Sequence, residues 1–549
     1  MATIRDLLLA RVDDPNPALA FEERSWSYAA YVGACAERAA YLLENRREGP
    51  LHVGVLLENV PEYAMWLGGA ALAGATVVGI NPTRRGAELA RDIGHTSCQL
   101  IVTESGQRPL LEGLDLGLGN DRVVDVDSRE WARALQPFAG SAIPDASTSE
   151  ASLFLLIFTS GTSGAPKACL CSQGRLATNG SILAQMMGFS ADDVLYCAMP
   201  LFHSNALMAC WAPALSVGAT CVLRRRFSAS GFLPDVRRYG VTYFNYVGKP
   251  LAYILATPER PDDADNPLRR AFGNEASDQD VERFQKRFGC TVTDAYGSTE
   301  GGVHVTRSDD MPRGSLGRGL PGVAVLDPET GEACPPARFG PDGRLLNADE
   351  AIGELANKLG AAGFEGYWRN DEASAARVHD GIYWSGDLAY MDEKGFLYFA
   401  GRDSEWLRVD GENFAAAPVE RILARQPGVA LAAVYAVPDE VVGDQVMAAL
   451  QLEPGAEFDA AEFATFLSQQ SDLGTKWAPR YVRICGTLPS TQTNKVLKRA
   501  LRKERWECQD PVWWRPEKGA PYRRLVEADR SAIRERFAAR GRSAALDGI

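Results

Sequence analysis

One stretch, residues 151–167, most constrains what this chain can fold into. It begins with an apolar run, Leu153–Phe158, whose branched and aromatic side chains are typical of a buried strand. A loop of glycines and small hydroxyl residues follows, and a proline and Lys167 close the stretch. A strand that leads into such a loop presents backbone N–H groups, hydroxyls and one ammonium to a polyphosphate. The stretch therefore predicts a phosphate-binding loop.

Two other interpretations of this loop are weaker. It is not a Walker A loop, because Lys167 comes three residues after Gly164 and is followed by Ala168 rather than by serine or threonine. A flexible Ser/Gly linker has a similar composition. A linker, however, needs neither a buried strand before it nor a fixed lysine after it.

Length and composition limit the classes of protein that fit. A chain of 549 residues is too long for one core, so two or more domains are expected. The net charge of −13 argues against a nucleic-acid binder and means that local donors must hold any phosphate-rich ligand. Eleven cysteines without a CxxC pair, and five scattered histidines, predict a reducing cytosol and no metal cluster.

Two uncharged runs, at residues 63–83 and 205–223, are long enough to be candidates for membrane spans. Both are rich in glycine and alanine, and each fits a buried helix, a glycine turn and a short strand better. The first residues carry no signal-peptide pattern, so a cytoplasmic protein is expected. Peripheral membrane contact and a homodimer stay open.

The order of patterns predicts an α/β fold with two domains. Helical and strand patterns alternate along the first 300 or so residues, which indicates parallel sheets covered by helices. Short glycine-rich strands from 312 to 402 suggest a β-rich subdomain, so that residues 1–402 would form a large N-terminal domain. Residues 403–509 read as a small, compact α+β domain that begins at Asp403, and 510–549 as a charged, partly helical tail.

Four further motifs complete a pattern. They are YGSTE at 296–300, SGD at 385–387, GRD at 401–403 and PSTQTNK, which ends at Lys495. With the phosphate loop, and in this order, they resemble the adenylate-forming superfamily of acyl-CoA synthetases, luciferases and peptide-synthetase adenylation domains. Longer stretches look like the branch of fatty-acid-transport proteins and very-long-chain or steroid acyl-CoA synthetases. These stretches are 242–255, 261–289, 408–420, 493–502 and 510–514.

The resemblance implies that several residues hold the phosphates of ATP. The phosphate loop would cradle the β- and γ-phosphates. Its residues are Thr159, Ser160, Gly161, Thr162, Ser163, Gly164 and Lys167. Thr299 would hydrogen-bond the α-phosphate, and Glu300 would hold Mg²⁺, which takes oxygen ligands. Such donors and charges are essential because a carboxylate must attack an anionic phosphate group.

Other residues would hold the adenosine of ATP. Tyr296 would stack on adenine, and Gly273 and Asn274 would line the base. Asp387 would accept both ribose hydroxyls, and Arg402 would donate to the ribose.

The two half-reactions would use the mobile C-terminal domain. Lys495 would bridge the acid carboxylate and the α-phosphate, a temporary role that suits a flexible point charge. The domain would then rotate about Asp403, withdraw Lys495 and bring in the loop around Gly411 to form a pantetheine tunnel. His203 matches a gate position beside the acyl and thiol channels. ATP, Mg²⁺ and coenzyme A are the implied cofactors.

Taken one at a time, these residues have plainer interpretations. Asp387 and Glu300 could be surface or capping acids, and Lys495 sits in a basic run typical of a solvated helix face. His203 could be a packed core histidine. The arginines at 224–226 could face solvent, or contact a CoA phosphate or an anionic membrane. Only the joint pattern favours catalytic roles.

Four positions depart from the family pattern, and the first is Ser163 in the phosphate loop, where threonine is usual. Asn494 stands where glycine is usual before the last lysine, and Asp410 where the branch often has a basic residue. Glu275 lies in NEAS, which replaces an Asn-Gly-Leu pattern.

The predicted function is that of an ATP-dependent acyl-CoA ligase for a long apolar acid, a fatty acid or a steroid side-chain acid. An adenylating enzyme that passes its acyl group to a carrier-protein thiol or an amine is the alternative, because the first half-reaction is shared. A non-enzymatic lipid-uptake protein, suggested by the two apolar runs, is a third hypothesis, and it alone does not need Lys495.

Overall fold

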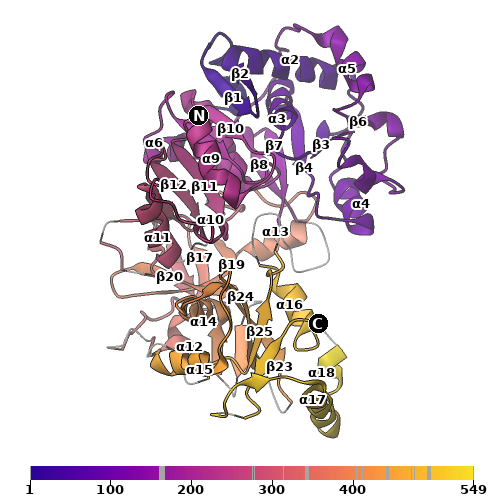
Figure 1. Cartoon of the computed structure of the whole chain (residues 1–549). Coiled ribbons are helices and arrows are strands. Elements are labelled where there is room, and N and C mark those ends of the chain that lie inside the picture. The colour runs from indigo at the N-terminus through magenta and orange to yellow at the C-terminus, as the bar shows by residue number, and fades with distance from the viewer. Residues whose placement is uncertain are drawn as a thin grey trace. The chain divides into compact units, whose positions relative to one another are not determined.

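The computed structural model resolves the chain into two compact units, and each is described by itself. The first unit contains residues 1–276, 281–301 and 361–378, and the second contains 277–280, 302–360 and 379–549. Figure 1 colours the chain from indigo at the N-terminus to yellow at the C-terminus. The described residues are 2–159, 167–274, 276, 278–308, 310–312, 314–340, 345–402, 406–409, 412–440, 444–470, 473–474, 476–490, 496–517 and 519–547.

The first unit contains two sheets that are almost entirely parallel, as the alternating patterns predict. One has the strand order β6-β5-β3-β4-β7-β8, and only β8 is antiparallel to its neighbour. Its strands are β3 (His52–Leu56), β4 (Thr76–Gly79), β5 (Leu100–Thr103), β6 (Val123–Asp125), β7 (Leu153–Phe158) and β8 (Ala168–Ser172). The carboxyl ends of its parallel strands therefore meet at one edge, where ligands bind in open α/β sheets.

The other sheet of the first unit has the order β13-β12-β11-β9-β10-β1-β2. Only β2 is antiparallel to its neighbour in this sheet. Its strands are β1 (Pro17–Phe21), β2 (Arg24–Ser27), β9 (Val194–Cys197), β10 (Thr220–Leu223), β11 (Tyr243–Val247), β12 (Arg270–Asn274) and β13 (Thr291–Asp294). The β1–β2 hairpin is a feature that the helical and strand patterns of the sequence do not indicate.

Helices follow most of these strands and begin at the signals present in the sequence. The Ser27 hydroxyl accepts a hydrogen bond from the Ala30 N–H and so caps α2, and Gly74, with φ +68°, ends α3. The α-helices of this unit are α1 (Ile4–Leu9), α2 (Tyr28–Glu44), α3 (Pro61–Ala73), α4 (Gly86–His95), α5 (Arg129–Leu135), α6 (Gln173–Met187), α7 (Ser204–Ala206), α8 (Ala212–Val217), α9 (Ala229–Tyr239), α10 (Pro250–Leu255), α11 (Asp278–Phe288) and α13 (Asp371–Arg377). Short 3₁₀ turns lie at η1 (Arg108–Leu111), η2 (Asn120–Arg122) and η3 (Gln136–Phe138).

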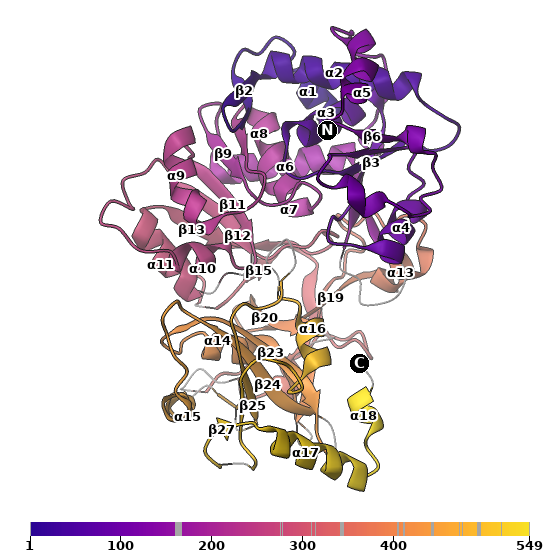
Figure 2. The ribbon, with the colours of Figure 1, turned by 45° about the vertical axis from the view of Figure 1, so that its right-hand side comes forward.

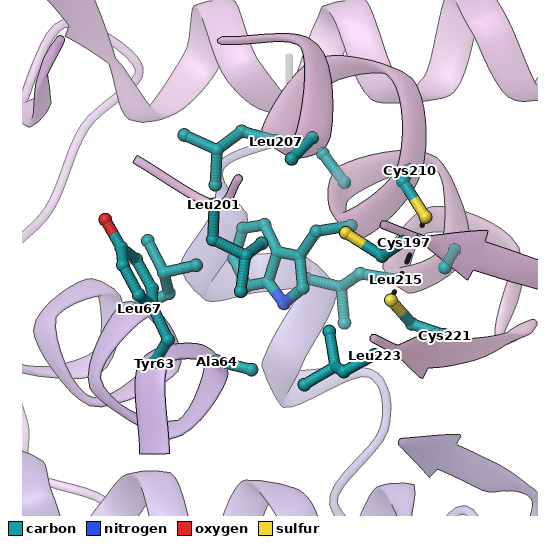
Figure 3. Close-up of a cluster of buried hydrophobic side chains, with 14 of the residues drawn as sticks. Tyr63, Ala64, Leu67, Cys197, Leu201, Leu207, Cys210, Leu215, Cys221 and Leu223 are labelled. Atoms are coloured by element: carbon teal, nitrogen blue, oxygen red, sulfur yellow. Dashed lines mark hydrogen bonds between the residues drawn. The ribbon is translucent and has the colours of Figure 1, made fainter. Parts of the chain in front are cut away.

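The segment from 206 to 218, which the sequence pattern predicts as one helix, is divided by a π-helical turn. This turn, η4 (Leu207–Trp211), separates α7 from α8. Pro213 has no N–H to donate to the carbonyl of Ala209 four residues earlier, so the α-helical hydrogen-bond pattern is interrupted there. The Tyr243 hydroxyl donates to that carbonyl instead, at 2.8 Å. Figure 3 shows Leu207, Cys210 and Leu215 of this segment in one cluster of buried side chains.

The second unit is β-rich. An antiparallel sheet has the order β14-β15-β20-β19-β17-β16, and a five-stranded sheet the order β23-β24-β25-β26-β27. The strands are β14 (Val305–Thr306), β15 (Gly317–Gly319), β16 (Val323–Leu326), β17 (Gly353–Asn357), β19 (Ile382–Met391), β20 (Phe396–Arg402), β21 (Trp406–Val409), β22 (Glu412–Ala415), β23 (Val429–Pro438), β24 (Asp444–Leu452), β25 (Tyr481–Cys485), β26 (Val512–Trp514) and β27 (Arg523–Arg524). A short strand, β18 (Val378–His379), lies where the chain passes from the first unit to the second.

The last forty or so residues contribute to the five-stranded sheet. β26 pairs with β25, and β27 pairs with β26, so the segment after Gln509 adds two strands before it becomes helical. β25, β27 and α17 can be followed in the yellow part of the chain in Figure 2. The helices of this unit are α12 (Ala348–Ala351), α14 (Ala416–Leu423), α15 (Ala460–Gln469), α16 (Lys498–Glu504), α17 (Glu527–Ala539) and α18 (Ala544–Asp547).

The first uncharged run folds as the sequence predicts, and the second does so except for the π-helical turn that divides its helix. Residues 63–83 contain most of α3 and then β4, and residues 205–223 contain α7, η4, α8 and β10. Within the described part of the chain, no helix combines the length and the apolar character that crossing a membrane requires.

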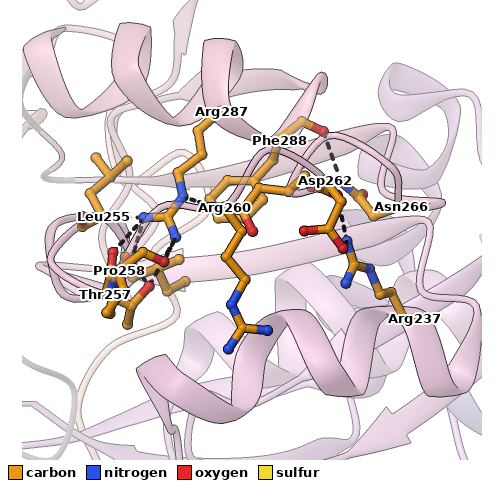
Figure 4. Close-up of polar contacts among 11 residues, drawn as sticks. Arg237, Leu255, Thr257, Pro258, Arg260, Asp262, Asn266, Arg287 and Phe288 are labelled. Atoms are coloured by element: carbon orange, nitrogen blue, oxygen red, sulfur yellow. Dashed lines mark hydrogen bonds and ion pairs between the residues drawn. The ribbon is translucent and has the colours of Figure 1, made fainter.

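Arg287 on α11 holds the loop that follows α10 in place through hydrogen bonds (Figure 4). Its guanidinium donates to the carbonyls at the end of that helix and beyond, including Thr257 at 2.9 Å and Pro258 at 3.0 Å. It also pairs with Asp263 at 2.7 Å, and the two side chains are 7% and 3% exposed. The end of a helix leaves carbonyls without partners, and one buried side chain here satisfies several of them.

Replacing Arg287 with leucine is expected to lower the free energy of unfolding of this unit by about 3–5 kcal/mol, because Asp263 would stay buried without its partner. Urea unfolding of the full chain measures the effect. Lys286→Leu, at the exposed neighbouring position on α11, is the control and should shift the midpoint little. Equal shifts for the two variants would contradict the role given to Arg287.

Candidate functional site

The predicted phosphate loop connects β7 to β8 at the edge of the first sheet. The two ends of the loop meet, because the Thr159 N–H donates to the Lys167 carbonyl at 3.0 Å. A hairpin thus presents the loop, whereas a Walker A loop runs from a strand into a helix. Five predicted loop residues lie outside the described residues, and their roles stay predictions. They are Ser160, Gly161, Thr162, Ser163 and Gly164.

Tyr367 connects the loop lysine to the predicted metal ligand. The Lys167 ammonium lies 6.0 Å from the centroid of the Tyr367 ring, and the Tyr367 hydroxyl donates to Glu300 Oε1 at 2.9 Å. Burial, followed by the nearby Glu300 carboxylate, raises the pKa of Tyr367, so this hydroxyl stays protonated and can donate. Two successive contacts therefore connect the Lys167 ammonium, the Tyr367 side chain and the Glu300 carboxylate beside the loop.

Backbone pairing with β8 fixes the position of Tyr367. The Leu170 N–H donates to the Gly366 carbonyl at 3.0 Å, and the Trp368 N–H donates to the Ala168 carbonyl at 2.8 Å. Residues 366–368 thus extend the sheet beyond β8, with Tyr367 opposite Cys169.

Arg175, on the first turn of α6, holds the loop that carries Thr299 and Glu300. One terminal nitrogen of its guanidinium donates to the carbonyls of Thr299 at 2.6 Å and Glu300 at 2.9 Å. The other donates to the carbonyl of Leu170 in β8 at 2.9 Å. A planar group with fixed donors thereby sets the distance between two segments that the chain brings together from far apart.

The hydroxyl of Thr299 contacts the turn that carries His203. Ser204 Oγ and Thr299 Oγ1 are 2.8 Å apart. His203 immediately precedes α7, and its ring centroid lies 4.4 Å from that of Phe202. The structure therefore brings the Thr299–Glu300 loop, Lys167 and the His203 turn into one region of the first unit.

The predicted adenine-binding residues lie at the ends of β12 and β13. A side chain at Gly273 is excluded, because a Cβ there would lie 2.4 Å from the Tyr246 carbonyl oxygen. Asn274 Nδ2 donates to the Gly297 carbonyl at 3.4 Å, and the buried Asn274 Oδ1 has no hydrogen-bond partner among the described residues. Tyr296 lies between Asn274 and Gly297 in sequence and is half-buried. Its stacking role stays a prediction.

The predicted ribose ligands belong to the second unit. Asp387 in β19 is 7% exposed and lies directly opposite Arg402 in β20. The Asp387 N–H donates to Ser385 Oγ at 3.1 Å, which fixes the backbone of the SGD motif. Lys495, Gly411 and Asp403 lie outside the described residues, as do Asn494, Asp410 and Glu275, so their roles stay predictions.

Two family models cover this chain. Residues 10–368 match the model described as AMP-binding enzyme, and residues 418–495 match the AMP-binding enzyme C-terminal domain. The chain belongs to the AMP-binding enzyme family. The first match contains the phosphate loop, the Thr299–Glu300 loop and Tyr367.

Two curated relatives match this AMP-binding enzyme along nearly its whole length. It is 51% identical over 543 residues to the steroid-22-oyl-CoA synthetase of Rhodococcus jostii (strain RHA1), and the match covers 98% of each chain. It is 50% identical over 512 residues to the medium/long-chain-fatty-acid–CoA ligase FadD17 of Mycobacterium marinum (strain ATCC BAA-535 / M), covering 93% of this chain and 98% of the relative. Both agree with the branch that the sequence motifs indicate.

A solved structure shows the same fold. The anthranilate CoA ligase AuaEII in complex with anthranoyl-AMP superposes with a TM-score of 0.79 at 21% identity, covering 91% of this chain and 96% of that one. The prediction of an adenylate-forming α/β fold is therefore confirmed.

The three arginines at 224–226 of this AMP-binding enzyme are engaged with carboxylates. Arg225 contacts Glu104 at 2.6 Å and Glu58 at 3.3 Å, and Arg226 also pairs with Glu58. Arg224 lies 3.2 Å from Asp235. An anionic ligand would have to displace these carboxylates, so the arrangement favours an ion-pair network on the protein surface over a phosphate site.

Two residues of the site, Tyr367 and Arg175, have no counterpart among the sequence predictions. Tyr367 lies 67 residues after Glu300 in the chain, and Arg175 lies 124 residues before Thr299. The only local signal is the aromatic, glycine-rich run GFEGYW at 363–368. Their proximity to the motif residues arises from strand pairing and helix placement, which a motif search does not encode.

Proposed function

We propose that this AMP-binding enzyme is an ATP-dependent acyl-CoA ligase that activates a fatty acid or a steroid side-chain acid. The acid carboxylate attacks the α-phosphorus of ATP, giving acyl-AMP and pyrophosphate. The thiol of coenzyme A then attacks the acyl carbonyl and displaces AMP. The observation that carries the proposal is the match of about half of all residues, over nearly the full length, to two enzymes named as CoA ligases for these acids.

The described residues offer part of what the first step is proposed to need. The Lys167 ammonium would neutralise charge on the leaving pyrophosphate, and the Thr299 hydroxyl would orient the α-phosphate. Glu300 offers a carboxylate beside the loop, which fits Mg²⁺ bound through one carboxylate and the substrate phosphates. That ion would supply further neutralisation of the phosphate charge when bound. Tyr367, by donating to Glu300 Oε1, fixes the carboxylate in one orientation.

The second step is proposed to depend on the C-terminal segment. Lys495 would leave after adenylation as the segment turns about Asp403, and the Gly411 loop would then admit the pantetheine thiol. A single lysine that serves only one of the two half-reactions is the testable core of this proposal.

An acid panel tests the proposed substrate class. Pyrophosphate release would be measured with ATP, Mg²⁺ and saturated fatty acids of increasing length, steroid side-chain acids, and benzoate as a short aromatic comparison. We expect release with long fatty or steroid acids and little with benzoate. A clear preference for benzoate, or release that does not depend on acid, would overturn the assignment.

The acyl acceptor is tested separately, because adenylation alone does not identify it. Coenzyme A would be compared with a phosphopantetheinylated carrier protein and with a simple amine at equal acyl-AMP formation. The proposal expects a thioester with coenzyme A. Transfer to the carrier protein or the amine, but not to coenzyme A at saturation, would favour the alternative acceptor.

Tyr367→Phe is expected to raise the Mg²⁺ concentration that gives half-maximal pyrophosphate release by roughly tenfold. The variant loses a hydrogen bond to a charged group, and such bonds contribute about 1.5–3 kcal/mol. A magnesium titration at saturating ATP measures the effect. Tyr398→Phe is a matched control, because its hydroxyl donates to Asp392 at 3.2 Å within the second unit, in a pair given no role in the site. A Tyr367→Phe titration that superposes on that of Tyr398→Phe would contradict the role of Tyr367.

A further inference from the structure

Three buried cysteines of the first unit, none of them among the predicted site residues, converge on one another. Cys197 ends β9, Cys210 lies in the π-helical turn η4, and Cys221 lies in β10. Their three sulfur atoms all lie within 4.8 Å of one another, and those of Cys210 and Cys221 are 3.9 Å apart. Among the described residues, this is the one group of three or more such side chains close enough to share an ion.

We call Cys197, Cys210 and Cys221 the trithiol cluster, and no sequence motif indicates it. The cysteines are separated by irregular intervals and match no metal-binding spacing. The π-helical turn is what places Cys210 near the two strands. The position of Cys210 in the cluster therefore depends on the interruption of the regular helix near Pro213.

The surroundings of the trithiol cluster are apolar. Figure 3 shows Leu215 and Leu223 beside it and Leu201 and Leu207 in the same cluster of buried side chains, and each of these leucines is at most 2% exposed. The three cysteines are themselves 0–2% exposed. A ligand complex that carries net charge would be costly in such a place, whereas a neutral complex would not.

The number and kind of ligands narrow the choice of ion. Thiolates select soft, thiophilic ions. Zinc, with bonds to sulfur of about 2.3 Å, would place its sulfurs about 3.8 Å apart, which fits the spacing, but structural zinc sites take four ligands. Three thiolates on a divalent ion would also leave one net negative charge. A trivalent, three-coordinate thiophile matches both the ligand count and the requirement for neutrality.

We propose that the trithiol cluster is a binding site for a trivalent arsenical of the arsenite class. Neutral As(OH)₃ would react with three thiols so that three As–O bonds break and three As–S bonds form. Each leaving hydroxide takes one thiol proton, so three water molecules depart and the product carries no charge. Neither arsenic nor sulfur changes its oxidation state, and no co-reactant is needed.

The thiols are not equivalent in this reaction. Hydrogen bonding from Cys197, and then from Cys210, lowers the pKa of Cys221, so Cys221 is the thiol that most readily supplies the first thiolate. Once formed, the three bonds would tie β9, η4 and β10 together. Cys197 and Cys210 lie on either side of the segment that carries His203 and Ser204 in sequence, so the bound arsenic would hold both ends of that segment.

The test uses the full, reduced chain and sodium arsenite as the probe. After prolonged incubation and desalting, intact-protein mass spectrometry should show one arsenic gained and three hydrogens lost per chain. The count of reactive thiols in denaturant, before any competing dithiol is added, should fall by three out of eleven. X-ray absorption at the arsenic edge should show sulfur neighbours only. Oxygen neighbours, or a loss of fewer than three thiols, would overturn the proposal.

Variants separate this site from incidental thiol pairs. Cys210→Ser keeps the size of the side chain but cannot form the third As–S bond, and retention of arsenic after desalting should fall at least tenfold. Cys221→Ala is a second route to the same result if the serine variant does not fold, as checked by circular dichroism. Cys290→Ser, at another buried cysteine of the same unit, is the matched control and should retain one arsenic. Retention equal to the unaltered chain in a folded Cys210→Ser or Cys221→Ala variant would overturn the proposal.

Discussion

Lys495→Ala is expected to slow acyl-adenylate formation by a factor of about 10²–10³, the usual cost of removing one well-placed donor from a charged transition state. The lysine ammonium is proposed to lie between two anions, the acid carboxylate and the α-phosphate, whose repulsion is greatest as they meet. Thioester formation from preformed acyl-adenylate should be nearly unchanged, because the lysine is proposed to have left by then.

Single-turnover assays of the two half-reactions measure this difference. Adenylation would be followed by pyrophosphate release in rapid-quench experiments, and thioester formation by adding coenzyme A to isolated acyl-adenylate and enzyme. Lys503→Ala is the control, since Lys503 is an exposed lysine of the same basic segment, on α16. Parallel loss of both half-reactions in Lys495→Ala would contradict the proposed alternation of the C-terminal segment.

Arg175→Met is expected to lower kcat/KM for Mg·ATP by about 10–100-fold, because the loop carrying Thr299 and Glu300 would lose charge-assisted hydrogen bonds at two carbonyls. The Arg175 guanidinium donates to backbone carbonyls of this loop and of β8, so we propose it as a positioning residue. Its loss should therefore raise the Mg²⁺ requirement of adenylation while leaving the KM for coenzyme A in the second half-reaction near that of the unaltered enzyme.

A matched variant separates positioning from general destabilisation. Arg5 in the same unit also donates to two backbone carbonyls, those of Leu72 and Pro144, with no contact to the site. Arg5→Met should lower the unfolding midpoint without changing the Mg²⁺ requirement. Arg175→Lys should recover part of the lost rate, because it restores a donor without the planar fork. If Arg5→Met and Arg175→Met changed the Mg²⁺ requirement alike, Arg175 would have no special place in the site.

Local features of the fold could be predicted because they are written in short stretches of sequence. Leu153–Phe158 is apolar and aromatic enough to predict a buried strand, and the following glycines and hydroxyl residues predict the loop. Ser27 and Gly74 mark the ends of helices through their capping chemistry. The alternation of strand and helix patterns indicates parallel sheets.

Other features depend on contacts between distant residues and could not be predicted from short patterns. The π-helical turn needs both Pro213, which removes a donor, and Tyr243, which supplies another. The prediction of one helix over residues 206–218 is wrong at this turn. The turn depends on a contact with Tyr243, which lies in β11 and is distant in sequence. The antiparallel direction of β8 likewise follows from the tight closure of the loop between Thr159 and Lys167.

The candidate site divides in the same way. Thr299, Glu300 and Lys167 are recognisable because the chemistry of nucleotide binding constrains residue type within each motif. Tyr367 donates to the Glu300 carboxylate, and Arg175 donates to the carbonyls of Thr299 and Glu300. The residues next to them in the sequence do not indicate these contacts. The trithiol cluster is a further case, in which three unrelated segments supply one residue each.

The product balance of one complete reaction tests the proposed acyl-CoA ligase activity most directly. The full chain would be incubated with ATP, Mg²⁺, coenzyme A and the best acid of the panel, and AMP and acyl-CoA would be quantified by chromatography and mass spectrometry. We expect AMP and acyl-CoA thioester in equal amounts, with both absent when the acid is omitted. Formation of ADP in place of AMP, or AMP without any thioester at saturating coenzyme A, would contradict the proposed activity.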